Sequence, residues 1–147
     1  MTKNPVYHFF YSPGNVGPLI LRLSLSGIFF YHGTQKALGW FGGPGWQGAV
    51  EALAGFGLPA VVTSLVIAME IAISLSLFFG FLTRLAGIAA AIVMSGALIV
   101  LSGQGAAFAD LELPGIILAA GLAIACLGGG ALSIDRAISR NLLPLVG

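Results

Sequence analysis

The chain has 147 residues, of which 58% are hydrophobic and only 7% are charged. Soluble domains carry about one quarter charged residues, so this composition excludes an ordinary soluble domain and indicates a membrane protein. The length fits a single domain, residues 1–147. A net charge of +1 gives no reason to expect nucleic-acid binding. The lone Cys126 excludes a disulfide within the chain, a Cys-x-x-Cys redox pair and a thiolate metal cluster.

Residues 1–16 form an N-terminal extension that precedes the first apolar stretch. The extension contains the aromatic segment Val6–Tyr11, followed by the turn-forming residues Ser12–Asn15. Aromatic rings with polar edges settle at the headgroup level of a bilayer. The extension is therefore either an interfacial anchor or a docking segment for another membrane subunit. A cleaved signal peptide is a poor interpretation, because the apolar stretch starts late and contains Arg22.

Four apolar stretches are long enough to cross about 30 Å of hydrocarbon. They are Gly17–Leu38, Pro59–Gly80, Leu85–Leu101 and Leu113–Leu127. Because a segment in lipid must satisfy its own backbone hydrogen bonds, each stretch predicts a helix. The expected fold is an all-α membrane protein, an antiparallel bundle of four transmembrane helices.

The cationic residues predict the orientation of this bundle. One end holds only Lys36, whereas the other collects Lys3, Arg22, Arg84, Arg136 and Arg140. Because cytoplasmic loops are enriched in Lys and Arg, both termini are expected in the cytoplasm, including the tail 131–147. The loops Gly39–Leu58 and Ser102–Glu112 then face outward.

The first outer loop contains a predicted amphipathic helix over Trp46–Phe56. Its apolar residues fall on one arc, with Gln47 and Glu51 opposite. Such a helix can lie flat in the outer interface of the membrane. It can equally cover the outer mouth of the bundle, and the sequence leaves both alternatives open.

Glu70 lies near the middle of the second predicted span. A carboxylate near a bilayer midplane costs at least ~2.5–3.5 kcal/mol on insertion scales, so Glu70 needs a partner, a proton or a function. The first span carries Arg22, His32 and Lys36. Lipid cannot satisfy these side chains, and we therefore expect them to face the bundle interior.

Two interpretations of this polar group remain open. Helix geometry places Glu70 ~16 Å below the outer end of its span and Arg22 ~8 Å above the inner end, about 7 Å apart in depth. This depth predicts an ion pair between Arg22 and Glu70 that fixes helix register. The alternative is a polar pocket in which Glu70 and His32 exchange protons with a ligand. The sequence contains no cluster of metal ligands, so no metal is expected.

Several motifs together resemble those of DoxX-type membrane proteins, over roughly Leu19 to Ile138. The matching segments are His32–Lys36 with Gly39–Gly45, Phe56–Pro59, Ala68–Glu70, Phe79–Arg84 and Leu132–Arg136. The resemblance implies a four-helix protein of the bacterial inner membrane, with relatives described as oxidoreductases or as subunits of quinone-linked redox systems. One departure is that Ile71–Ser74 follow Glu70 where glycines are usual in the family, which would narrow a pocket.

From the resemblance we expect a subunit of a quinone-associated membrane oxidoreductase. A bound quinone headgroup would lie between His32 and Glu70 as catalytic residues, with a neutral Glu70 donating to one quinone oxygen. The other residues expected to contact the ligand are Arg22, Lys36, Trp40 and Trp46, the tryptophans near the entrance. The bilayer and a protein subunit or second copy are the expected partners. Alternatives are a non-catalytic subunit of a larger membrane complex and a small-molecule or proton permease.

Overall fold

The structure is a computed structural model that describes residues 11–12 and 14–142. Four long helices carry the fold: α2 (Val16–Leu38), α4 (Ala60–Phe79), α5 (Thr83–Gly103) and α6 (Phe108–Leu127). Three short ones accompany them: η1 (Trp40–Gly42), α3 (Gly45–Ala54) and α7 (Ile134–Leu142). The described residues contain no strand, which confirms the all-α prediction. The aromatic segment up to residue 10 and the tail from residue 143 lie outside the described residues.

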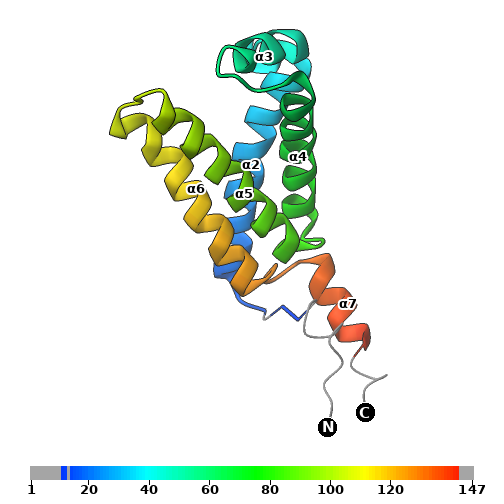
Figure 1. The fold of residues 1–147 in the computed structure, drawn as a ribbon. Coiled ribbons are helices and arrows are strands. Elements are labelled where there is room, and N and C mark those ends of the chain that lie inside the picture. The colour runs from blue at the N-terminus through cyan, green and yellow to red at the C-terminus, as the bar shows by residue number, and fades with distance from the viewer. Residues whose placement is uncertain (1–10, 13, 143–147) are drawn as a thin grey trace.

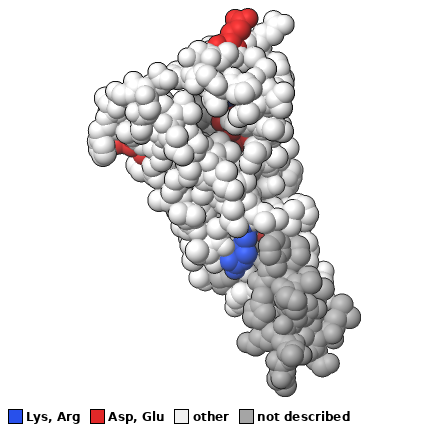
Figure 2. Space-filling view, in the orientation of Figure 1, with Lys and Arg blue, Asp and Glu red and all other residues white. Residues whose placement is uncertain are grey.

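Three helices, α4, α5 and α6, are each long and apolar enough to cross a membrane. They leave large apolar side chains uncovered, with Val61 70%, Ile99 73% and Ile116 67% exposed. Figure 2 shows one face as largely free of charge, with charged atoms near its two ends and inside one hollow. A surface of this kind suits lipid rather than water. The predicted first span is also a helix, α2, but it is not among these three.

The predicted spans correspond to four of the helices, with shifts at their ends. The structure extends the third span to Thr83–Gly103 and the fourth to Phe108–Leu127. The fourth therefore begins five residues before the predicted Leu113 and includes Asp110 in its first turn. We predicted a loop as far as Glu112, because Asp110 and Glu112 interrupt the apolar run. The connection between α5 and α6 is correspondingly short, residues 104–107.

The long helices are arranged as two pairs, α2 with α4 and α5 with α6 (Figure 1). The pairs meet near α7 and diverge toward the opposite end, where α3 packs against α2 and α4. We call these the α7 end and the α3 end. The helices α5 and α6 pack closely at Gly87, where an added Cβ would lie 2.6 Å from the carbonyl oxygen of Gly121. Small residues thus allow backbone contact between these helices.

The helix ends at the α7 end are capped by charged side chains. Asp135 of α7 accepts hydrogen bonds from the N–H groups of Leu82 and Thr83, at 2.8 and 2.9 Å, and from the Thr83 hydroxyl. These groups begin α5, where backbone donors have no partner within the helix. Arg84 donates to the carbonyls of Ala125 and Cys126, both at 2.7 Å, at the end of α6.

The hydrophobic core lies between the two helix pairs, around Phe29, Leu77, Ala90 and Ile124.

Candidate functional site

The register between α2 and α4 is fixed by two serines. The Ser26 hydroxyl donates to the Ser74 carbonyl at 2.9 Å, and the Ser74 hydroxyl donates to the Ser26 carbonyl at 3.0 Å. One and two turns farther toward the α3 end, Glu70 and Gly33 lie where the helices are in close contact. An added Cβ at Gly33 would lie 3.4 Å from the Glu70 Cβ. The glycine therefore lets α4 approach α2 beside the carboxylate.

The partner of Glu70 is Lys36. The Lys36 Nζ donates to Glu70 Oε1 at 2.5 Å, and the side chains are 29% and 3% exposed respectively. The second carboxylate oxygen, Oε2, is buried and has no hydrogen-bond partner among residues 11–12 and 14–142. A buried polar atom without a partner costs about 1–3 kcal/mol. One carboxylate oxygen is thus bound to Lys36, while the other is buried without a donor from these residues.

The predicted ion pair between Arg22 and Glu70 is wrong. Arg22 is 1% exposed and lies at the α7 end. Its guanidinium donates to backbone carbonyls at the end of α4 and in the connection that leads to α7: Leu77 (2.6 Å), Phe78 (2.6 Å), Gly129 (2.9 Å), Ala131 (3.4 Å) and Leu132 (2.7 Å). A guanidinium has five N–H donors and can satisfy several acceptors at once. These carbonyls, and not the Glu70 carboxylate, accept its hydrogen bonds.

The direction of helical side chains explains this correction. Side chains in an α-helix lean toward the N-terminus of their helix. Arg22 therefore extends away from Glu70, whereas Lys36, farther along the same helix, extends back toward it. Glu70 lies on the antiparallel α4 and leans toward the α3 end, hence toward Lys36. Arg22 reaches the level of Phe78, eight residues or about 12 Å from Glu70.

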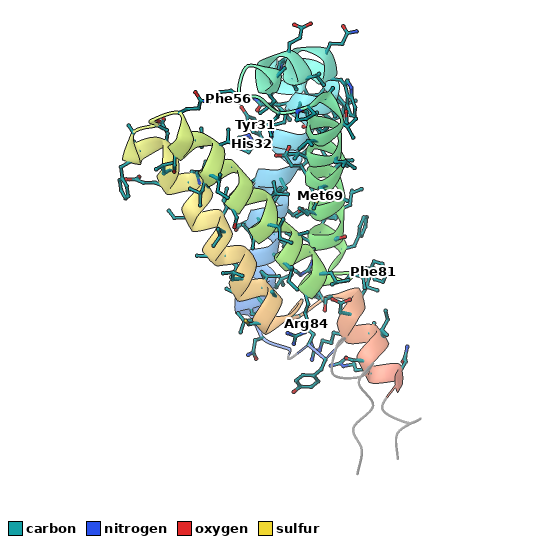
Figure 3. The ribbon with its side chains drawn as sticks, viewed as in Figure 1. Tyr31, His32, Phe56, Met69, Phe81 and Arg84 are labelled. Carbon is teal, nitrogen blue, oxygen red and sulfur yellow. The ribbon has the colours of Figure 1, made fainter. Side chains whose placement is uncertain are left out.

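A cavity of about 620 Å³ lies between the diverging helix pairs. Its walls come from α2, α4, α5, α6, the end of α3 and the segment that follows α3. The lining is mostly apolar, and its polar side chains are His32, Lys36, Thr63, Glu70 and Asp110. Figure 3 shows His32 and Phe56 near the α3 end, with Arg84 at the opposite end. The cavity therefore combines an apolar interior with a small polar group on one wall.

Three of the six predicted site residues meet at this cavity. Glu70, His32 and Lys36 all contribute to its lining. Arg22, Trp40 and Trp46 are not among the lining residues. Trp40 instead makes an edge contact with Phe30, with ring centroids 6.3 Å apart, and is 51% exposed. The tryptophans expected at the entrance are thus outside the cavity walls.

The helix predicted in the first outer loop is present as α3, with Gln47 and Glu51 exposed as expected. Leu53 at its end and Phe56 just beyond it line the cavity. This favours the covering role for the segment, while its placement in a membrane interface stays a prediction. Sequence reasoning did not anticipate the opposite wall, which includes Ile92 and Pro114. Apolar residues that line a cavity and those that face lipid have the same pattern in a sequence.

The chemistry available at the cavity follows from three groups. Glu70 offers a carboxylate oxygen that can accept a hydrogen bond, and the Lys36 ammonium carries donors beyond the one given to Glu70. The His32 imidazole can donate a hydrogen bond with one ring nitrogen and accept one with the other. His32 and Lys36 are neighbours at four-residue spacing on α2. An elongated apolar molecule with a polar head matches this arrangement.

An all-helical chain with lipid-compatible helices and a polar group in an apolar cavity defines a small membrane protein with a ligand-sized site. The sequence profile of the DoxX family matches residues 17–103, more than half of the chain, and the protein belongs to that family. The chain is also 28% identical over 126 residues to "Putative oxidoreductase CatD" of Bacillus subtilis (strain 168), covering 86% of this chain and 90% of that protein. No solved structure gives a significant match. The family resemblance deduced from the motifs is thereby confirmed.

Proposed function

We propose that this protein is the quinone-binding subunit of a membrane oxidoreductase. The headgroup of an isoprenoid quinone binds beside Glu70 and Lys36, and its tail follows the apolar walls of α5 and α6. The observation that carries the proposal is the buried Oε2 of Glu70, which has no partner among the described residues and belongs to a residue that lines the cavity. The oxidoreductase name of the Bacillus subtilis relative supports the same class of function.

The size and lining of the cavity support a ligand of this kind. Ligand pockets in proteins measure roughly 300–1,000 Å³ and are mainly apolar with a few polar groups, and this cavity has about 620 Å³. His32 lies one turn from Lys36 and serves as the proton relay for the bound headgroup. Electrons come from another subunit or a diffusible carrier, because the chain has neither paired cysteines nor a second histidine within its spans.

In the proposed arrangement α2, α4, α5 and α6 are four antiparallel transmembrane helices in a bacterial inner membrane. The α7 end faces the cytoplasm, since it carries Arg22, Arg84, Arg136 and Arg140. Reporter fusions at Gly147 and near Gly105 are then expected on opposite sides of the membrane, with Gly147 inside. A C-terminal reporter on the periplasmic side would contradict the orientation.

A second candidate is a non-catalytic subunit of a larger membrane complex. The observed ion pair Lys36–Glu70 favours it, because an ion pair between two helices can fix their register without binding a ligand. A permease is less well supported, because the buried cluster that includes Leu25, Leu77 and Ile124 is apolar. The buried Arg22, Ser26 and Ser74 beside it donate to backbone carbonyls.

Binding of a short-chain quinone analogue to the protein in lipid nanodiscs distinguishes the first two candidates. Gly96 lines the cavity and has open space where a Cβ would be, so Gly96→Leu fills the cavity without a clash at the backbone. Gly27 also has open space and does not line the cavity, which makes Gly27→Leu the matched control. We expect saturable binding that Gly96→Leu abolishes and Gly27→Leu preserves. Absence of saturable binding, or equal binding by both variants, would favour the structural subunit.

A further inference from the structure

We infer that the cavity selects a ligand that presents a hydroxyl group to the pair Lys36–Glu70, which for a quinone-type carrier is the reduced quinol. This inference rests on the proposed function for the class of ligand. It goes further in assigning the redox state that binds, and it replaces the expectation of a neutral, donating Glu70.

The first step concerns the charge of Glu70. Its Oε1 accepts a hydrogen bond from the Lys36 ammonium at 2.5 Å, in a position where the Glu70 side chain is 3% exposed. A direct hydrogen bond from an ammonium favours the ionised form of a carboxyl group, because the two opposite charges attract each other. An ionised carboxylate only accepts hydrogen bonds and has no proton to donate. The available Oε2 is therefore an acceptor.

The second step concerns what can face Oε2. The residues from 14 to 142 and residues 11–12 supply no donor to this oxygen. A quinone carbonyl is itself an acceptor, so it would place two electron-rich oxygens against each other. A quinol hydroxyl carries the proton that Oε2 needs. The reduced ligand thus satisfies a buried atom that the oxidised ligand leaves without a partner.

The third step concerns Lys36. Its ammonium has three donors, and one of them is directed to Glu70. The side chain is 29% exposed and lines the cavity, so the ammonium can reach a ligand as well. A hydroxyl oxygen can accept from Lys36 while its proton is donated to Glu70. The carbonyl oxygen of a quinone can also accept from Lys36, but it has no proton to donate to Glu70.

The remaining polar side chains do not alter this preference. The imidazole of His32 can donate with one nitrogen and accept with the other, so it accommodates either redox state. Asp110 lines the cavity but is an exposed residue in the first turn of α6. Selection by redox state accordingly resides in Glu70. A site of this type serves a reaction in which the quinol is either the electron donor or the product.

The test uses a set of ligands that differ only in their hydroxyl groups. An alkylhydroquinone, its monomethyl ether and its dimethyl ether are titrated anaerobically into the protein in nanodiscs, and each dissociation constant is measured by calorimetry. Because a hydrogen bond to a charged group corresponds to roughly tenfold or more in affinity, the hydroquinone and monomethyl ether should bind about tenfold more tightly than the dimethyl ether. The corresponding quinone should resemble the dimethyl ether.

Two variants test whether the preference for a hydroxyl-bearing ligand depends on Glu70. In Glu70→Gln the amide offers a donor as well as an acceptor, so the quinone should gain affinity and the tenfold preference should disappear. Glu51 is exposed on α3 and does not line the cavity, so Glu51→Gln should keep the preference. The affinities of the ligand series for the unmodified protein test the selection of a hydroxyl group even if Glu70→Gln does not fold.

The outcomes separate this inference from the proposed function. Equal affinity for hydroquinone and dimethyl ether would overturn the selection of a hydroxyl and leave quinone binding in place. A preference that persists in Glu70→Gln would assign the hydroxyl contact to another residue and overturn the role of Glu70. Failure of every member of the series to bind would overturn the proposed function together with the inference.

Discussion

The buried charged residues at the two ends of the molecule differ in the groups to which they are hydrogen-bonded. At the α7 end, Arg22 and Asp135 are buried, and their polar contacts are mainly to backbone groups at helix ends and connections. Toward the α3 end, Lys36 and Glu70 contact each other across α2 and α4, and one carboxylate oxygen has no partner in the part of the chain that the structure describes. The hydrogen bonds of Arg22 and Asp135 thus stabilise the fold, whereas one acceptor atom of Glu70 is not used by the described residues.

This difference shows how to recognise function among buried charges. A buried ion whose hydrogen bonds are complete stabilises one conformation and offers nothing to a ligand. A buried ion with one free atom beside a cavity carries an energetic cost that a ligand can remove. By this criterion Glu70 is a candidate binding residue, while Arg22 is a structural one despite being equally buried.

The largest effect is expected from removing Arg22. Arg22→Met keeps the length of the apolar stem but deprives buried carbonyls such as Leu77 and Gly129 of their donor. The free energy of unfolding should fall by about 3 kcal/mol or more, because several buried acceptors lose their partner together. Unfolding in detergent, followed by circular dichroism, measures the loss. Arg140 is exposed, so Arg140→Met serves as the control and should stay within about 0.5 kcal/mol.

The next effect concerns the pair at the α3 end. Lys36→Met and Glu70→Gln each leave one member of the pair Lys36–Glu70 without its partner, and the double variant removes both halves. The double variant should therefore be less destabilised than the two single losses summed, with a coupling of about 1–3 kcal/mol. In contrast, Arg22→Met and Glu70→Gln should be additive within about 0.5 kcal/mol, because those residues share no partner. Strong coupling between Arg22 and Glu70 would contradict the observed pairing.

A smaller effect is expected at the start of α5. Asp135→Ala removes the acceptor for the N–H groups of Leu82 and Thr83. The loss of a side-chain cap of this kind costs about 1–2 kcal/mol. Because the contact joins α7 to α5, limited proteolysis should also cut near α7 sooner in the variant. An unchanged unfolding curve would show that α7 does not stabilise the α7 end.

The sequence allowed much of the fold and part of the site to be predicted. Apolar length predicted the four long helices. The polar residues of the first span were expected to face the bundle interior, where Arg22 is buried and Lys36 lines the cavity. We did not predict that Lys36, rather than Arg22, pairs with Glu70. The depths of these side chains in the bundle were estimated without the lean of helical side chains toward the N-terminus. The divergence of the helix pairs could not be predicted, since a cavity depends on tertiary angles that leave no periodic pattern.

The smallest predicted effect contrasts the two ends within one helix. Gly96 of α5 lines the cavity and has open space where a Cβ would be. Gly87, nearer the α7 end of the same helix, packs against the backbone of α6, and an added Cβ would lie 2.6 Å from the Gly121 oxygen. Alanine is favoured over glycine in a helix by about 0.8–1 kcal/mol, so Gly96→Ala should raise the free energy of unfolding by up to that amount.

The same substitution at Gly87 should have the opposite sign, because overpacking a close helix contact costs more than the gain in helix propensity. Both variants add one methyl group to one helix, so only their surroundings differ. Thermal unfolding in detergent compares them directly. Stabilisation by both would indicate that α5 and α6 can separate near Gly87, and destabilisation by both would indicate that the helix pairs close against each other around Gly96.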